Sequence, residues 1–238
     1  MGPGRTILNQ LAQQVVQANI STEILYSFII IVCSLMIYYG TKEIYELSSY
    51  KGLKFFRQAF LFFALAYFFR SFIKLILFYF NVHGIFSISP KLLNPLISQI
   101  TLTLFMYFSA MAIFYLLYSV MYKKRNYENK IYLFHVISVV LAVFSVVSRN
   151  PFSYLGLNIL LLVFVLVIVY ISYKNSKKKT KGHNLYAIYV LLLFFWILNI
   201  IDILIPTFFQ NFQLIVYIAS SGIFFLMLYK VLKKAGSN

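Results

Sequence analysis

Residues 53–80, LKFFRQAFLFFALAYFFRSFIKLILFYF, decide the class of fold. A helix crosses the hydrocarbon core of a bilayer with about 20 consecutive apolar residues, and this run is longer than that. Two basic residues, Arg70 and Lys74, lie well inside it. The stretch therefore predicts a transmembrane helix that carries positive charge at membrane depth.

The composition of the whole chain points to the same solvent. Hydrophobic residues make up 62% of the 238 residues and charged residues 11%, whereas soluble domains carry roughly 25% charged residues. A soluble chain of this length could not bury so much apolar surface. The lipid bilayer is therefore the expected partner, and a soluble protein is excluded.

Seven apolar runs are long enough to cross a bilayer, and the fourth is the shortest. We therefore predict an all-α integral membrane protein, a seven-transmembrane-helix bundle. The predicted spans cover residues 22–40, 55–80, 96–122, 131–148, 152–173, 185–205 and 212–232.

The segments around these spans set the expected domain boundaries. In residues 1–21 apolar side chains recur every three or four positions, which predicts an N-terminal amphipathic segment, either a helix at the membrane interface or a disordered tail. Residues 22–232 form the transmembrane domain and residues 233–238 a short basic cytoplasmic tail. Ser21-Thr22-Glu23 and Asn94-Pro95 resemble helix starts, and Gly40 and Gly52 are typical of loops.

The distribution of Lys and Arg predicts the orientation. Sixteen of the 21 basic residues fall in the connections after the first, third and fifth spans and in the C-terminal tail, and three fall on the opposite side. Positive residues favour the cytoplasmic face, so we expect the N-terminus outside and the C-terminus in the cytoplasm. No cleavable signal peptide is apparent, and a multi-pass protein of a prokaryotic cytoplasmic membrane is expected.

The charged residues inside the spans are the candidate site. Asp202 is the one acidic residue that lies within an apolar run, and simple counting at 1.5 Å per residue puts it at the depth of Lys74. Arg70 and Lys74 share a helix face, and so do Asn199 and Asp202. Charges at this depth usually pair, which predicts an ion pair between Asp202 and Arg70 or Lys74. Two cations against one acid leave a positive surplus, which favours a small anionic ligand, a water-filled cavity or a missing partner; a purely structural ion-pair network is the alternative.

Other polar residues gather in the outer halves of the spans. Ser98, Thr101, Asn158 and Ser220 are candidates for the lining of a cavity open to the outside. The alternative is that they are ordinary helix-packing residues, which are often small or hydroxylated in membranes. The segment Ala219-Ser220-Ser221-Gly222 in particular favours close packing or a kink.

Motifs for catalysis and metal binding are not found. The three histidines are scattered over different predicted loops and ends, without the spacing of a metal site, and no phosphate-binding loop, nucleophile elbow or HExxH motif occurs. We therefore expect no enzyme activity, no cofactor, no metal and no nucleic-acid partner. The basic cytoplasmic loops could contact anionic lipids.

Three functions fit this topology. A receptor- or sensor-like module with an outward-facing polar site is favoured, because the candidate residues cluster in the outer half. The alternatives are a small-solute transporter or channel, and an accessory subunit or scaffold that acts through a protein partner.

Overall fold

The computed structural model describes the backbone of residues 3–83, 90–122, 131–148, 151–177, 185–204 and 210–235. The side chains of residues 3–20, 73, 74, 76–98, 151, 177, 210, 211, 234 and 235 lie outside the description. The described segments form helices α1 (Pro3–Ser48), α2 (Lys51–His83), α3 (Pro90–Met121), α4 (Ile131–Val147), α5 (Pro151–Lys177), α6 (Tyr186–Leu204) and α7 (Gln210–Ala235).

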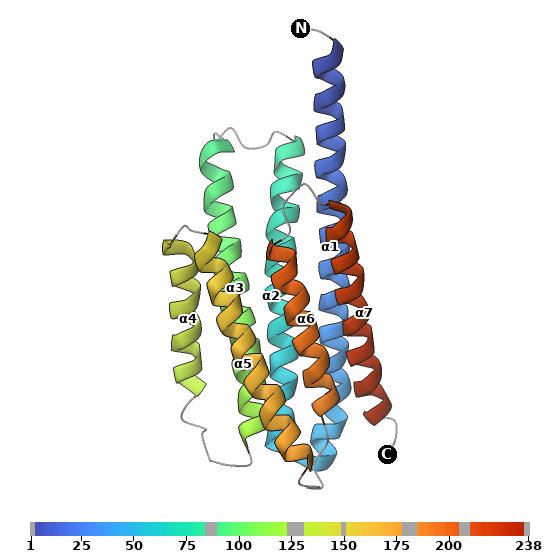
Figure 1. Cartoon of the computed structure of the whole chain (residues 1–238), viewed down its shortest axis with the longest axis vertical. Helices are drawn as coiled ribbons and strands as arrows, with labels where there is room; N and C mark the ends of the chain where they lie inside the picture. Colours follow the sequence, from blue (N-terminus) through green and yellow to red (C-terminus); the bar gives the residue numbers. More distant parts are fainter. Residues whose placement is uncertain are drawn as a thin grey trace.

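The helices run up and down as an antiparallel bundle (Figure 1). Six of them close into a ring in the order α1, α2, α3, α5, α6, α7, because each contacts the next and α7 returns to α1. The fourth helix, α4, lies at the edge of the bundle and packs mainly on α3 (Figure 1). The first and last helices are therefore neighbours, although they lie at opposite ends of the chain.

The surface of the bundle is apolar, which confirms that this is an integral membrane protein. Large hydrophobic side chains are exposed on helices all round the bundle, among them Phe28, Val140, Leu166 and Ile218. Among the described residues, six helices are long and apolar enough to span a membrane. In the described part of the chain α4 has 17 residues, or about 25 Å at 1.5 Å per residue. The seventh span and the orientation therefore stay predictions.

Aromatic rings fill the middle of the bundle. Phe56, Phe60 and Phe63 on α2 are fully buried, and Phe63 contacts Phe195 and Trp196 on α6 and Phe224 on α7. Small residues allow the helices to approach one another closely: Ala59, Ala66, Ala110 and Ala112 are all buried. The core is therefore packed with side chains at this level.

The first helix corrects two expected boundaries. It runs from Pro3 to Ser48 without a break, so Ser21-Thr22-Glu23 is not a helix start and Gly40 is not in a loop. The chain turns at Ser49 and Tyr50 instead, where Ser49 has the left-handed φ of 49° that often follows a helix end. Gly52 belongs to α2. Gly40 packs close to Leu232 of α7. Packing between the two helices therefore outweighs the tendency of glycine to form a loop at this position.

The third helix corrects a further boundary. It begins at Pro90, before the predicted start at Asn94-Pro95, because proline is well tolerated in the first turn of a helix. The N-terminal segment of residues 1–21 continues into the first span as part of α1, and its separate role as an amphipathic segment stays a prediction.

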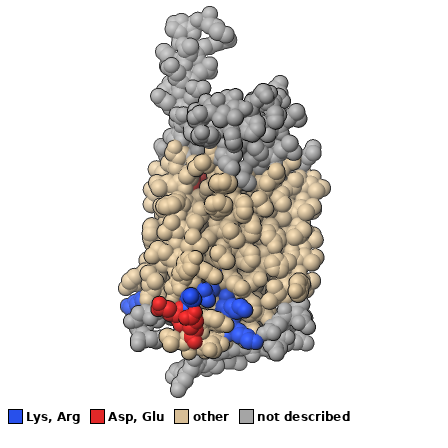
Figure 2. Space-filling model, turned by 180° about the vertical axis from the view of Figure 1, so that it is seen from behind, with Lys and Arg blue, Asp and Glu red and all other residues tan. Residues whose placement is uncertain are grey.

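Charged residues gather at one end of the bundle. On the face seen in Figure 2, Lys, Arg and acidic side chains form a band at the end opposite to the N-terminus. Lys42 and Glu46 on α1 pair there at 3.8 Å and are well exposed. Arg57 of α2 donates from Nε to the carbonyl of Tyr38 at 3.1 Å and lies over the Tyr38 ring. This band is the predicted cytoplasmic end; the end that carries the N-terminus is the predicted outer end.

Candidate functional site

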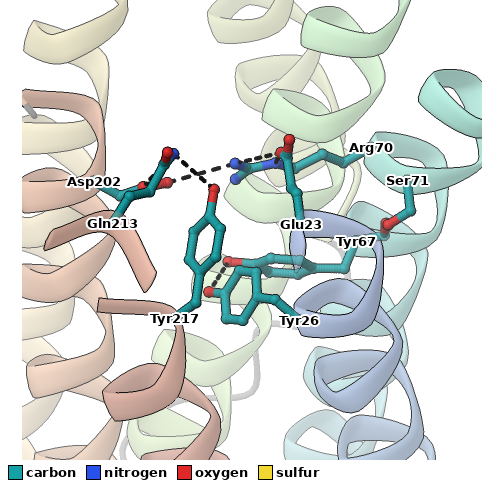
Figure 3. A network of polar contacts seen from close by, with 8 residues as sticks. All are labelled: Glu23, Tyr26, Tyr67, Arg70, Ser71, Asp202, Gln213 and Tyr217. Carbon is teal, nitrogen blue, oxygen red and sulfur yellow. Dashed lines mark hydrogen bonds and ion pairs between the residues drawn. The ribbon is translucent and has the colours of Figure 1, made fainter. Parts of the chain in front are cut away.

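An ion-pair cluster lies near the predicted outer end, between α1, α2 and α6 (Figure 3). Arg70 of α2 donates from Nε to Glu23 Oε1 at 2.9 Å, and its Nη2 lies 2.9 Å from the same oxygen. Two N–H groups of one guanidinium therefore meet one carboxylate oxygen, and this charge-assisted contact is among the stronger polar interactions. It joins α1 to α2.

Asp202 of α6 approaches the same guanidinium from the other side. Its Oδ2 lies 3.5 Å from Arg70 Nη2, so it forms an ion pair that is longer than the one with Glu23. The planar guanidinium can engage two carboxylates at once because its donors point in fixed, separate directions. Arg70 thus connects three helices.

Hydrogen bonds extend the cluster to α7. Gln213 Nε2 donates to Asp202 Oδ1 at 3.2 Å and lies 2.8 Å from the hydroxyl oxygen of Tyr217. Tyr217 in turn stacks on Tyr26 of α1, with ring centroids 4.5 Å apart and nearly parallel planes. Four helices therefore meet around the cluster (Figure 3).

Tyr26 also contacts a further tyrosine, Tyr67 of α2, directly below the ion pairs (Figure 3). The hydroxyl groups of Tyr26 and Tyr67 are 3.3 Å apart, and Arg70 lies within 5.9 Å of the Tyr67 ring centroid and 5.4 Å of that of Phe105. Such cation–π contacts stabilise a guanidinium that has left water. The aromatic rings thus form the floor of the cluster.

The cluster is mostly buried but reachable. The side chains of Arg70, Glu23 and Asp202 are 16%, 15% and 9% exposed. Water or a small ion can therefore approach, while most of each charged group is shielded. An interior charge of this kind is expensive unless it is paired, and the pairing of Arg70 with two acids meets that need.

The described side chains of the cluster include one acid more than expected. Arg70 keeps its charge at all accessible pH values, and it faces two carboxylates, so the described side chains of the cluster carry a formal excess of one negative charge. The predicted positive surplus did not include Glu23. Lys74, the second expected cation, has a side chain outside the described residues, so the net charge of the whole cluster stays a prediction, and so does an anionic ligand.

Glu23 is the site residue that sequence reasoning missed. Its place near the N-terminal end of an apolar run resembled a helix start, so it was assigned to capping. The one signal for it in the sequence is its expected depth in the membrane. Glu23 lies near the predicted outer end of the first span and Arg70 near the predicted outer end of the second, so the two side chains can meet at the same level. Gln213 and Tyr217 were missed because neutral polar residues are common in membrane helices.

The other predicted residues lie on several helices. Asn199, one turn before Asp202 on α6, and Asn158 of α5 are both buried, and so is Ser220 of α7. Thr101 of α3 is half-buried, and the side chain of Ser98 lies outside the described residues. Among the predicted residues, the structure brings Arg70 and Asp202 into direct contact. Their role in binding stays a prediction.

The small-residue segment on α7 differs in part from its expected packing role. Ser220 and Ser221 are buried, whereas a Cβ atom added at Gly222 would meet nothing within 4 Å. Gly222 is therefore not a close-packing point within this chain.

Two buried amide groups, one on α5 and one on α6, have polar atoms without a hydrogen-bond partner among the described residues. Within the described part of the chain, no hydrogen-bond partner reaches Asn158 Oδ1 or Asn199 Nδ2. The backbone carbonyl of Asn158 accepts a hydrogen bond of 3.1 Å from Trp196 Nε1, which holds α5 against α6 at this level. Among the described residues no group of three or more His, Cys, Asp or Glu side chains could hold a metal ion.

Comparison with known proteins gives one informative relative. The chain is 31% identical over 217 residues to an uncharacterized protein of Archaeoglobus fulgidus, an alignment that covers 90% of this chain and 93% of the relative. No family model matches the chain, and no solved structure matches it.

Proposed function

We propose that this chain, which belongs to the same family as the uncharacterized Archaeoglobus fulgidus protein, is a receptor- or sensor-like membrane module. The single observation that supports the proposal is the position of Arg70, which joins α2 to Glu23 of α1 and to Asp202 of α6 near the predicted outer end. We call these three residues the outer lock.

The two halves of the outer lock differ in strength, and this suggests how it would open. The Arg70–Glu23 contact is 2.9 Å and uses two donors, whereas the Arg70–Asp202 contact is 3.5 Å. Binding of a ligand to Asp202 would therefore release α6 while α1 and α2 stay joined. A ligand shifts such an equilibrium by its differential affinity for the two states, and the released helices would carry the change to the basic end.

The packing beneath the outer lock favours a sensor over a transporter. Phe63, Phe195 and Phe224 are fully buried and in mutual contact, and Phe63 lies two helical turns below Arg70. Moving a solute past them would need a large rearrangement of these rings. The proposed site is thus open to one side of the membrane only.

Spin-label distances test the proposal. Leu47 of α1 and Tyr229 of α7 are exposed near the opposite end of the bundle, so a Cys33→Ser, Leu47→Cys, Tyr229→Cys chain in lipid nanodiscs reports on the packing of α1 against α7. We expect Asp202→Asn and Arg70→Gln to shift the measured distance distribution. Tyr107→Phe, which removes the contact with His135 between α3 and α4, is the matched control and should leave it unchanged.

An unchanged distance distribution in the variants would contradict the proposal. If Asp202→Asn and Arg70→Gln lower the melting temperature but leave the distance distribution as in the parent chain, the outer lock only holds the bundle together. The sensor proposal would then be wrong, and the accessory or scaffold function would take its place.

A further inference from the structure

We propose that Arg57 of α2, together with Lys42 of α1 and Lys54 of α2, forms a binding site for the phosphate group of an anionic membrane lipid. The site lies where α1 and α2 meet at the predicted cytoplasmic end. It is built on helices, whereas the lipid contacts expected from the sequence lie in the loops. The inference does not depend on the sensor function or on the outer lock.

Contacts with α1 hold the Arg57 guanidinium in one place. Its Nε donates to the backbone carbonyl of Tyr38 at 3.1 Å. Its central carbon lies 4.7 Å from the ring centroid of Tyr38 and 6.0 Å from that of Tyr45. A guanidinium that is already held by a carbonyl and by aromatic faces loses little further freedom when it binds an anion. The group is therefore preorganised for a ligand.

The charge of Arg57 has no acidic partner among the described residues. None of their carboxylates forms an ion pair with it, and its two Nη groups donate no hydrogen bond to them. Arg70, by contrast, pairs with both Glu23 and Asp202. Arg57 is half-buried, and a charge that is partly withdrawn from water is stabilised by an opposite charge. The expected partner is therefore an anion from outside the chain.

The parts of the chain outside the description cannot reverse the charge at this end. The chain has five acidic residues in all, and Glu23 and Asp202 belong to the outer lock. Three acids remain for the predicted cytoplasmic end, against sixteen basic residues: Glu43, Glu46 and Glu128. This end of the bundle therefore stays positive and attracts anions.

Two lysines flank Arg57. Lys42 lies one turn after Tyr38 on α1, so it is on the face that Arg57 contacts. Lys54 lies one turn before Arg57 on α2 and is exposed. Lys42 pairs with Glu46 at 3.8 Å, but both side chains are well exposed, and such a pair contributes little. Both ammonium groups can therefore turn toward a bound phosphate.

The position of Arg57 along α2 places it at the boundary of the membrane. Arg57 and Arg70 are 13 residues apart, or about 20 Å along the helix. The hydrocarbon core is about 30 Å thick, so the two residues cannot both lie in bulk water. Arg57 lies six residues from the start of α2, close to the predicted cytoplasmic headgroups. Arginines at this level extend toward the polar headgroups.

The surroundings favour a lipid phosphate over free phosphate. Guanidinium groups bind phosphate through paired hydrogen bonds, and either source offers that group. Exposed apolar side chains, spaced by three or four positions, continue from the site along one face of α1: Tyr39, Met36, Val32 and Phe28. Tyr39 precedes Lys42 by one turn on that face. An acyl chain can lie along these side chains, whereas free phosphate makes no use of them.

Thermal unfolding of the full chain in detergent tests the site. The purified protein is compared with added phosphatidylglycerol, with added phosphatidylcholine and with inorganic phosphate, all at equal ionic strength. We expect a saturable rise of the melting temperature by several degrees with phosphatidylglycerol, since a ligand that binds only the folded state stabilises it. Phosphatidylcholine carries no net charge and inorganic phosphate has no acyl chain, so each should give less than half of that rise.

Variants that remove charge assign the effect to the proposed residues. Arg57→Gln should lose most of the difference between phosphatidylglycerol and phosphatidylcholine, and a Lys42→Gln, Lys54→Gln chain, which changes exposed residues only, should lose part of it. The matched control is Lys174→Gln, which removes one exposed charge at the same end from α5, across the helix ring from α1; it should keep the full difference. The comparison is made within each variant, so a lower absolute stability does not obscure it.

Native mass spectrometry of the same proteins provides a second measurement. At low lipid concentration we expect one bound phosphatidylglycerol fewer in Arg57→Gln than in the parent chain and in Lys174→Gln.

Three outcomes would overturn the inference. The first is an equal rise of the melting temperature with phosphatidylglycerol and phosphatidylcholine. The second is an equal rise with inorganic phosphate, which would exclude a lipid as the ligand. The third is a loss in Lys174→Gln as large as in Arg57→Gln, which would mean that the whole basic end attracts lipid without a defined site. None of them affects the spin-label test of the outer lock, so the two proposals fail independently.

Discussion

Glu23 Oε1 lies 2.9 Å from both Nε and Nη2 of Arg70, although 47 residues separate them in the sequence. This contact fixes α1 against α2 near one end of the bundle, and Arg57 with Tyr38 does the same near the other end. The two helices are thus held by an arginine at each end. Only the Glu23–Arg70 contact is shared with a third helix, through Asp202.

The two acids of the outer lock should differ in their contribution to stability. Glu23→Gln is expected to cost about 2–3 kcal/mol, because it removes an acceptor of two charge-assisted hydrogen bonds, and Asp202→Asn about 1 kcal/mol. Either change leaves one acid with Arg70, so the difference reflects geometry and not net charge. Unfolding in detergent of both variants would measure it, and a larger loss in Asp202→Asn would contradict the assigned strengths.

Arg70 should tolerate no single replacement well. Arg70→Leu leaves two carboxylates mostly buried, which we expect to cost about 3 kcal/mol, near the lower end of the range for a broken buried pair because the group is partly exposed. Arg70→Lys should lose less, but more than Glu23→Gln, since one ammonium cannot reproduce the forked geometry. Replacement of Glu23, Arg70 and Asp202 together by Leu should recover much of the stability that Arg70→Leu alone loses, because no unpaired carboxylate is then left buried. Equal stability of Arg70→Leu and the parent chain would exclude a tightly paired lock.

Cysteine labelling can decide the number of spans. Tyr132 at the start of α4 and Phe152 at the start of α5 are 79% and 78% exposed, so they are matched reporters at the two ends of α4. In a Cys33→Ser background, a membrane-impermeant maleimide should label Phe152→Cys in intact cells, and Tyr132→Cys and Leu47→Cys only after permeabilisation. Labelling of both α4 reporters from outside would mean that α4 does not cross the membrane.

Three helical glycines should respond differently to alanine. An added Cβ atom would meet nothing within 4 Å at Gly156 and Gly222, but would lie 3.1 Å from Leu232 Cδ2 at Gly40. Alanine is favoured over glycine in a helix by up to about 1 kcal/mol, so Gly156→Ala and Gly222→Ala should be neutral or stabilising. Gly40→Ala should gain less, because the Leu232 side chain has to shift.

Gly40→Leu carries the same argument further. It should weaken the packing of α1 on α7 and lower the melting temperature of the purified protein. If Gly40→Leu is as stable as Gly222→Leu, the close approach at Gly40 does not matter.

Helix content and membrane class could be read from the sequence because they depend on local properties. Each apolar run is long enough for a span by itself, and a bilayer forces its backbone into a helix. The ends were less predictable. Ser21-Thr22-Glu23 and Gly40 carry signals of a start and a loop, but α1 continues through both, because the preference of a few residues is small beside the continuity of a long apolar helix.

The candidate site could be predicted only in part. Arg70 and Asp202 stood out because charge is rare in apolar runs, and the structure places them 3.5 Å apart. Glu23 did not stand out, although it makes the shorter contact. Its importance depends on the level at which α1 packs against α2, and no pattern within either segment encodes that level.

The sequence by itself determined that this chain is a helical membrane protein with ionisable groups inside its spans, since hydrophobicity and helical length act along a single segment. Only the tertiary structure decided which groups meet. It placed α1 beside α2 and α7 and brought Glu23 to Arg70, and so added an acid that the expected surplus of positive charge had left out. The sign of the charge at a site is a sum over neighbouring helices, and that sum exists only once the helices are packed.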